Sequence, residues 1–202
     1  MANVDNPFGF KLISPFNPNY IRYYPLVTAY ATAVFRNDVV GAPAAMAGLV
    51  CGALDGSTRP GMEIIAVGVA GEVFGVVQAT MDSNMLPTTS FVCLAVGDAV
   101  VAAYVAVCTD PDAQYLVQED GDTTPIPIAS TGMNCDAIST HAGNTLTGIG
   151  KMELDSDTEN ATATLAWKLL YTFERDIPAT AYCRWIVKLN AAAMGDNIAS
   201  PE

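Results

Sequence analysis

The sequence predicts an all-β fold, a sandwich or barrel of short antiparallel strands. The first observation is residues 160–190, where hydrophobic side chains occupy every second position in the runs 163–173 and 183–189. A period of two is the pattern of strands with one buried face. Breaking residues separate the two runs, which predicts an antiparallel hairpin with Trp167 and Trp185 in one core.

The second observation is a series of short, valine-rich runs, each bounded by turn residues such as glycine and aspartate. Their regular spacing is typical of an all-β sandwich or barrel. The third observation is that helix signals are scarce along the chain. The strands predicted ahead of the hairpin cover residues 28–40 (a pair), 49–54, 64–69, 72–79, 91–96, 99–108 and 114–118.

Residues 1–24 are predicted to form an extended N-terminal arm. Four prolines up to Pro25 exclude a long helix or a central strand, while six aromatic residues from Phe8 to Tyr24 would be poorly tolerated in a solvated tail. The arm is therefore expected to dock its rings, either on its own domain or on a neighbouring subunit.

The other predicted boundaries are an all-β domain over residues 25–190, with a division into two β subdomains near residue 110 left open, and a flexible tail over residues 191–202. Two stretches of the domain are predicted to lack strands. Residues 129–141 are expected to be irregular, with at most one helical turn, and residues 155–160 are expected to form a polar turn before the hairpin.

The charge balance argues against nucleic acid as a partner. The chain has 9 Lys and Arg against 21 Asp and Glu, a net charge of −12, whereas contact with a phosphate backbone needs cations that replace counterions. No basic residue lies between Arg59 and Lys151, and that interval holds ten acids. The middle of the chain is therefore purely anionic.

Neither a membrane span nor a secretory signal is predicted. The apolar run 91–108 has Gly97-Asp98 near its centre and no basic flank, so two buried strands account for it better. The N-terminus lacks a basic region followed by an apolar one. Five widely spaced cysteines in mostly apolar runs are typical of reduced core thiols in a cytoplasmic product.

No catalytic residue, metal site or cofactor is predicted. His141 is the single histidine and lies in no recognisable catalytic motif. The glycine-rich residues 143–151 look like a phosphate loop, but Ile149 stands where that motif requires lysine. Acidic clusters without the spacing of an EF-hand are interpreted as solvated turns: Asp110 with Asp112, Glu119 with Asp120 and Asp122, and Asp155 with Asp157 and Glu159.

Several short motifs follow one another along most of the chain, with residues 41–109 matching less well. They are Met1-Ala2-Asn3 with Pro7-Phe8-Gly9-Phe10, Thr32 to Phe35 with Asp38-Val39-Val40, Asp110-Pro111-Asp112 through Tyr115 to Asp120, and Gly148 to Asp155 with Thr164-Leu165 and Arg184 to Asn190. In this order they resemble a family of tailed-bacteriophage virion proteins, the capsid decoration, cement or head-stabilising proteins.

The resemblance implies many copies bound outside an icosahedral head, often as trimers at local threefold positions, and no catalytic residue. The implied partners are the major capsid protein and the chain itself as a homotrimer. The implied location is the head surface of a virion that is assembled in the host bacterial cytoplasm.

We expect contacts with the capsid or with other subunits through arm aromatics and scattered cations. Removal of residues 1–24 is expected to weaken attachment and to leave the β domain folded. The predicted contact residues are Phe8, Phe10, Phe16, Arg22, Arg36, Arg59, Arg184 and Lys188.

A second class remains open, a phage tail or fibre module that binds a receptor or glycan. It would expose Trp167 or Trp185 as a platform for a sugar ring. The strict alternation around both tryptophans argues against this, because it predicts that both rings are buried. A hydrolase is a third class, for which the sequence offers no motif.

Overall fold

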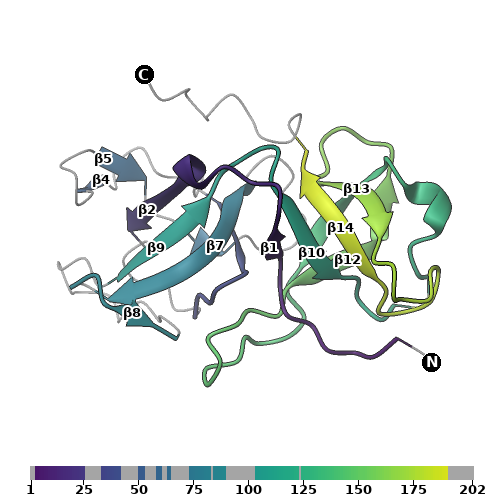
Figure 1. The fold of residues 1–202 in the computed structure, drawn as a ribbon, viewed down its shortest axis with the longest axis horizontal. Coiled ribbons are helices and arrows are strands. Elements are labelled where there is room, and N and C mark those ends of the chain that lie inside the picture. Colours follow the sequence, from purple (N-terminus) through teal and green to yellow (C-terminus); the bar gives the residue numbers. More distant parts are fainter. Residues whose placement is uncertain are drawn as a thin grey trace.

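The predicted all-β sandwich is confirmed: two antiparallel sheets pack together (Figure 1). The structure is a computed structural model. It describes residues 3–25, 33–41, 50–52, 58–60, 63–64, 73–82, 84–89, 103–122 and 124–190. Among these residues, no helix is long and apolar enough to cross a membrane. The described residues also form two short 3-10 turns, η1 (Pro18–Tyr20) and η2 (Ile128–Ser130).

Sheet A contains most of the C-terminal half of the chain and one N-terminal strand. Its strand order is β1-β10-β14-β13-β11-β12. These strands are β1 (Lys11–Ile13), β10 (Gln114–Gln118), β14 (Arg184–Leu189), β13 (Trp167–Thr172), β11 (Asn134–Ile138) and β12 (Glu153–Asn160).

Sheet B contains strands that precede residue 110. Its order is β2-β9-β7-β3-β6, with β8 paired to β7, and β4 and β5 form a separate pair. The strands are β2 (Ile21–Pro25), β9 (Ala103–Cys108), β7 (Val73–Asp82), β3 (Val39–Gly41), β6 (Glu63–Ile64), β8 (Pro87–Thr88), β4 (Val50–Gly52) and β5 (Thr58–Pro60). The chain passes from sheet B to sheet A over residues 109–113. A division into subdomains near residue 110 stays a prediction.

The predicted hairpin is confirmed, and both of its tryptophans are buried in one core. Strands β13 and β14 pair antiparallel, with Trp167 opposite Leu189, and the side chains of Trp167 and Trp185 are both 0% exposed. The first strand begins at Trp167 and not at residue 163, because Asn190 Nδ2 donates to the carbonyl oxygen of Ala163 and holds that segment in a turn.

One side chain of the hairpin faces the opposite way from the prediction. The register shifts between Leu169 and Tyr171, which is the signature of a β-bulge. The extra residue reverses the alternation beyond it, so the side chain of Tyr171 is 50% exposed and donates a hydrogen bond to Gln114 Oε1 at 3.3 Å. A sequence with a regular hydrophobic alternation carries no signal for such a bulge.

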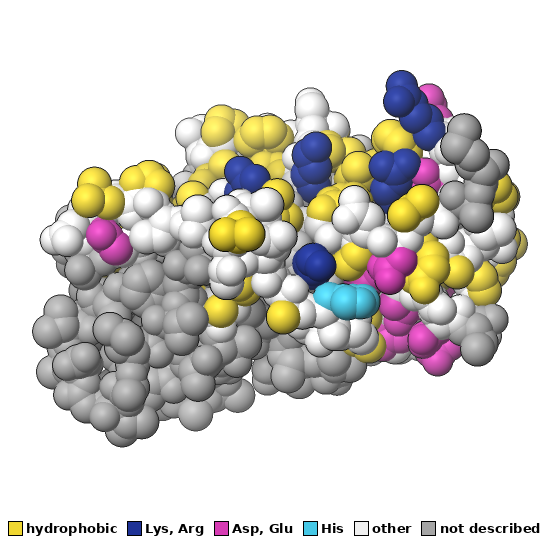
Figure 2. Space-filling view, turned by 90° about the horizontal axis from the view of Figure 1, so that it is seen from below, with side chains coloured by type: hydrophobic (Ala, Val, Ile, Leu, Met, Phe, Trp, Pro, Cys, Tyr) yellow, Lys and Arg dark blue, Asp and Glu magenta, His cyan; other side chains and the backbone are white. Residues whose placement is uncertain are grey.

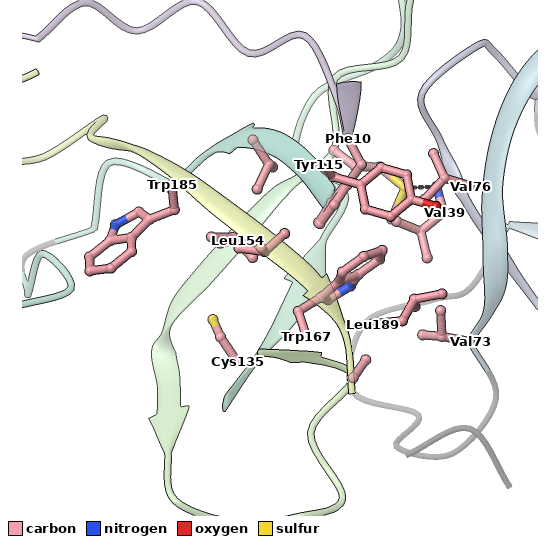
Figure 3. Close-up of a cluster of buried hydrophobic side chains, with 14 of the residues drawn as sticks. Phe10, Val39, Val73, Val76, Tyr115, Cys135, Leu154, Trp167, Trp185 and Leu189 are labelled. Carbon is pink, nitrogen blue, oxygen red and sulfur yellow. Dashed lines mark hydrogen bonds between the residues drawn. The ribbon is translucent and has the colours of Figure 1, made fainter. Parts of the chain in front are cut away.

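One hydrophobic core joins both sheets and the N-terminal segment (Figure 3). The Phe10 ring stacks on Trp167 with centroids 4.3 Å apart, and Tyr115 meets Trp167 edge-on at 5.4 Å. Val39 and Val76 of sheet B belong to the same buried cluster. Large aromatic rings therefore fill the space between the sheets, where they exclude the most apolar area from water.

The N-terminal arm is extended, and it docks on its own chain. Strand β1 pairs with β10 and β2 pairs with β9, so the segment supplies one edge strand to each sheet. In Figure 1, β1 runs between sheet B and the rest of sheet A. That the domain stays folded without residues 1–24 stays a prediction, and the structure argues against it, because this deletion removes β1, most of β2 and the ring stacked on Trp167.

Two stretches that were predicted to lack strands form β11 and β12. Strand β12 is an edge strand of mostly polar residues, held partly by side-chain hydrogen bonds. Ser156 Oγ donates to Asp120 Oδ1 at 2.7 Å, and the backbone N–H of Asp136 donates to Thr158 Oγ1 at 3.0 Å. Such bonds leave no hydrophobic periodicity in the sequence, which explains why β11 and β12 were not predicted. The one helical turn allowed near residue 129 is present as η2.

Several predictions fall partly or wholly outside the described residues. They include the strands expected near residues 28–32, 65–69 and 91–102, the side chains of Cys51 and Cys93, and the tail over residues 191–202. Three cysteines are described, and all are buried with free thiols: Cys108, Cys135 and Cys183.

Candidate docking groove

An open groove of about 510 Å³ lies beside the N-terminal segment. Of the nine basic residues of the chain, three lie in its lining, and none of the described lining residues is acidic. The lining residues are Phe8, Lys11, Leu12, Arg36, Asn37, Gln78, Leu116, Ile149 and Arg184. A smaller hollow of about 370 Å³ shares Phe8 and Arg184 with it. The groove thus combines cations with apolar side chains on a chain of strongly negative net charge.

The wall beside Phe8 is held by a turn that contains Asn37. Asn37 Nδ2 donates to the carbonyl oxygen of Phe8 at 2.9 Å, and the Phe10 N–H donates to the Asn37 carbonyl oxygen at 2.8 Å. Gly9 at φ 70° and Asn37 at φ 73° both occupy the left-handed region. Glycine and asparagine adopt this region at the lowest cost, so the local sequence favours the contact.

Gly9→Ala is expected to lower the free energy of unfolding by about 2–4 kcal/mol, because left-handed backbone strain adds to a steric clash. A Cβ at Gly9 would lie 2.6 Å from the carbonyl oxygen of Asn37. Gly132→Ala is the matched control: Gly132 also has a positive φ, of 91°, but nothing lies within 4 Å of its added Cβ. This control should lose only about 1–2 kcal/mol. Chemical denaturation measures both losses, and equal losses would contradict the clash.

Arg36 is fixed at the groove by a short parallel bridge to the segment around Ile149. The Arg36 N–H donates to the Gly148 carbonyl oxygen at 3.1 Å, and the Gly150 N–H donates to the Arg36 carbonyl oxygen at 2.7 Å. The neighbouring turn is closed by Asp38, whose Oδ2 accepts from the Phe35 N–H at 2.8 Å. Burial raises the pKa of Asp38 to about 7.

Arg184 is held in place by a bidentate ion pair with Asp176. Its Nε donates to Asp176 Oδ2 at 2.8 Å and its Nη2 to Oδ1 at 2.5 Å, while the guanidinium lies 4.4 Å from the ring centroid of Phe173. The hydrogen bonds to Asp176 raise the pKa of Arg184. Because Asp176 offsets the charge of Arg184, the uncompensated cations of the groove are Lys11 and Arg36, which have no ion pair among the described residues.

The groove brings together Phe8, Arg36 and Arg184 among the predicted contact residues. The prediction that Phe10 contacts the capsid or another subunit is wrong, because its side chain is 0% exposed and lies in the core, where no other molecule reaches it. The remaining predicted residues lie elsewhere: Phe16 is exposed after β1, Arg22 is half-buried in β2, Lys188 lies 3.5 Å from Asp112, and Arg59 is in β5 with its side chain outside the described residues.

Sequence reasoning missed Lys11, Leu12, Leu116 and Ile149 as lining residues. A signal existed for Leu116, because the alternation in β10 places Tyr115 and Val117 in the core and Leu116 on the opposite face. For the others no local pattern exists, since they meet only through pairing of β1 with β10 and of Arg36 with Ile149.

His141 makes a polar contact outside the groove, with a buried carboxylate. His141 Nδ1 lies 2.9 Å from Glu153 Oε2 and 3.0 Å from Thr140 Oγ1, and Glu153 is 1% exposed. Burial raises the pKa of Glu153. A catalytic triad uses the two ring nitrogens for different partners, whereas Glu153 and Thr140 both meet Nδ1. The contact is therefore suited to anchoring the loop after β11 to β12.

Four carboxylates, those of Asp120, Asp122, Asp155 and Asp157, gather where the turn after β10 meets β12. The interpretation of these clusters as solvated turns is wrong for Asp120 and Asp155, which are only 5% and 8% exposed. Ser156 donates to Asp120 from both its N–H and its hydroxyl, and the Asp157 N–H donates to Asp155 Oδ1 at 3.2 Å. The nearby charge of Asp120 raises the pKa of the exposed Asp122. Within the described residues, no group of three or more side chains has an arrangement that could hold a metal ion.

Fold and site together define an all-β sandwich protein with an open, cationic and partly apolar groove. No protein-family model, curated protein or solved structure matches this chain.

Proposed function

We propose that this protein is a non-enzymatic structural protein of a tailed-bacteriophage virion, a capsid decoration or cement protein. It binds the outer surface of the icosahedral head and stabilises the closed shell. Its partners are the major capsid protein and further copies of itself, as a homotrimer. It joins the head surface during assembly in the host bacterial cytoplasm.

The groove is the observation that carries the proposal. Its lining comes from segments far apart in the sequence, near residues 8–12, 36–37, 116, 149 and 184. Apolar surface with arginine is the composition of protein contact sites. Backbone hydrogen bonds hold the walls before any partner arrives, so little conformational entropy is lost on binding. The order of the sequence motifs resembles that of decoration proteins, and this resemblance is the reason for placing such contacts on a phage head.

The net charge of −12 supports the same function. An anionic protein on the outside of a head remains soluble and does not compete for the packaged genome. Stabilisation then follows from mass action, because a ligand that binds the closed shell better than its dissociated subunits shifts the equilibrium toward the shell.

The alternative, a glycan-binding tail or fibre module, receives no support from the tryptophans. It needs an exposed indole as a platform, and the side chains of Trp167 and Trp185 are both 0% exposed. Trp167 is covered by Phe10, and Trp185 Nε1 lies 3.3 Å from Glu119 Oε2 inside the protein. Neither ring therefore meets a ligand without unfolding its surroundings.

The purified protein is expected to bind heads assembled from the major capsid protein of the same phage, and to raise the temperature at which they fall apart. A free concentration of about 100 times the Kd adds roughly 2.7 kcal/mol per occupied site. Co-sedimentation measures binding, and light scattering during heating measures disassembly. Unassembled capsid protein is the control. Equal binding to heads and to unassembled subunits, or no binding to heads, would contradict the proposal.

A further inference from the structure

We propose that the groove receives an acidic surface of a second copy of this chain, so that copies associate head to tail. The acidic surface consists of the exposed Asp122 and Asp157 with the buried Asp120 and Asp155 behind them, and these four carboxylates are here called the acidic patch. The inference rests on the proposed function, in which copies of the chain bind one another, and it names the two surfaces that meet.

The groove presents positive charge that the described part of its own chain leaves uncompensated. Lys11 and Arg36 are exposed, and among the described residues neither makes an ion pair. Between and beside them lie apolar side chains such as Leu12 and Leu116. A partner that fits this lining brings carboxylates together with some apolar surface, and its cations would be repelled.

The acidic patch presents the matching charge, which the described residues also leave uncompensated. Asp122 and Asp157 are exposed, and no described basic side chain lies within ion-pair distance of any of its four carboxylates. Hydrogen bonds from Ser156 hold Asp120 in place, so the like charges stay together instead of separating. Contact with a cationic surface offsets this mutual repulsion, so the electrostatic energy favours binding of the patch to the groove.

The two surfaces are separate on one molecule. None of the four aspartates of the acidic patch lines the groove. On the face shown in Figure 2, acidic side chains gather to the right of and below the histidine, while one basic side chain lies directly beside the histidine and the others lie above it. The groove of one copy therefore meets the patch of a different copy. Because the two surfaces differ, the contact is heterologous, and such contacts close into a ring when the rotation between copies allows it. Three of them would close the trimer of the proposed function.

Exchange of charges tests the pairing more sharply than salt does, because salt screens both the local attraction and the repulsion between copies of net charge −12. The groove variant carries Lys11→Glu with Arg36→Glu, and the patch variant carries Asp122→Lys with Asp157→Lys. All four side chains are exposed, so the fold tolerates the changes. The fourfold variant combines both pairs and restores opposite charges with their signs exchanged.

Sedimentation velocity of the isolated protein, over a wide range of concentration, is the measurement. The wild type is expected to self-associate, the groove and patch variants to associate about tenfold more weakly or worse, and the fourfold variant to recover the wild-type assembly. Lys151→Glu with Lys168→Glu is the control, since it changes the net charge as the groove variant does but lies outside the groove lining. It should associate more strongly than the groove variant.

A monomeric wild type, a groove variant that associates as the wild type does, or a folded fourfold variant that stays monomeric would each overturn the inference. No heads are present in this experiment. A negative result in this experiment would therefore contradict the pairing of groove and patch without contradicting head binding. A protein that does not bind heads could likewise still self-associate through the groove and the patch.

Discussion

Phe10→Ala is expected to lower the free energy of unfolding by about 3–5 kcal/mol, the usual loss for removing a buried phenylalanine ring. The Phe10 side chain is 0% exposed and stacks on Trp167 at 4.3 Å, so its removal leaves a cavity against one of the two tryptophan rings of the core. Urea denaturation followed by tryptophan fluorescence measures the loss.

Phe16→Ala is the matched control for Phe10→Ala. Both residues lie in the N-terminal segment, but Phe16 is 42% exposed, and its loss should cost within about 0.5–1 kcal/mol. If both variants lose equally little, the N-terminal segment is a loosely docked arm and its place in the core is wrong. A large loss for Phe10→Ala alone shows that residues 1–24 belong to the folded unit.

The stability of the protein is expected to fall as the pH rises from about 4.5 to about 7, because of Glu119. This carboxyl is 0% exposed, and burial raises its pKa from 4.5 to about 7. Over that interval the folded chain keeps a proton that the unfolded chain has released, so a rise in pH favours unfolding. The loss for this one group is on the order of 3 kcal/mol, and it levels off above pH 7.

Glu119→Gln is expected to flatten this pH dependence and to stabilise the protein at pH 8. Glu119 Oε2 accepts hydrogen bonds from the Ile126 N–H at 3.0 Å and from Trp185 Nε1 at 3.3 Å, and an amide oxygen can accept both. Part of the slope remains, because Asp38 has a pKa raised to about 7 by burial and contributes with the same sign.

Urea denaturation at pH 5 and at pH 8 measures the effect of Glu119→Gln. Glu159→Gln, in the polar edge strand β12, is the control and should keep the wild-type slope. A slope in Glu119→Gln that equals that of the wild type would show that the buried carboxyl is not the source of the pH dependence.

The best-predicted parts of the fold are the strands whose buried face follows from a local alternation of apolar and polar residues. Strand β10 lies where residues 114–118 were expected, and the hairpin of β13 and β14 has its tryptophans in the core, as alternation requires. The all-β class followed from the same local signal. Short-range alternation reports which face of a strand is apolar, and this is a property of each segment alone.

The wrong or missing predictions share one cause: contacts between residues far apart in the sequence leave no local sequence pattern. Strand β12 is polar because it is a sheet edge held by side-chain hydrogen bonds, and the bulge before Tyr171 interrupts an otherwise regular alternation. The docking of Phe10 on Trp167 joins residues at opposite ends of the chain. Its aromatic character predicted burial but not the surface that would bury it.

By itself, the sequence determined the β class, the buried tryptophans, the extended N-terminal segment and the negative charge, since each depends on residue type or on near neighbours. Only the tertiary structure decided that Phe8, Arg36 and Arg184 share one groove while Phe10 fills the core. The reason is physical. The walls of the groove are set by bonds between distant segments, such as Asn37 to Phe8 and Arg36 to Gly148, and these exist only once the sheets have packed.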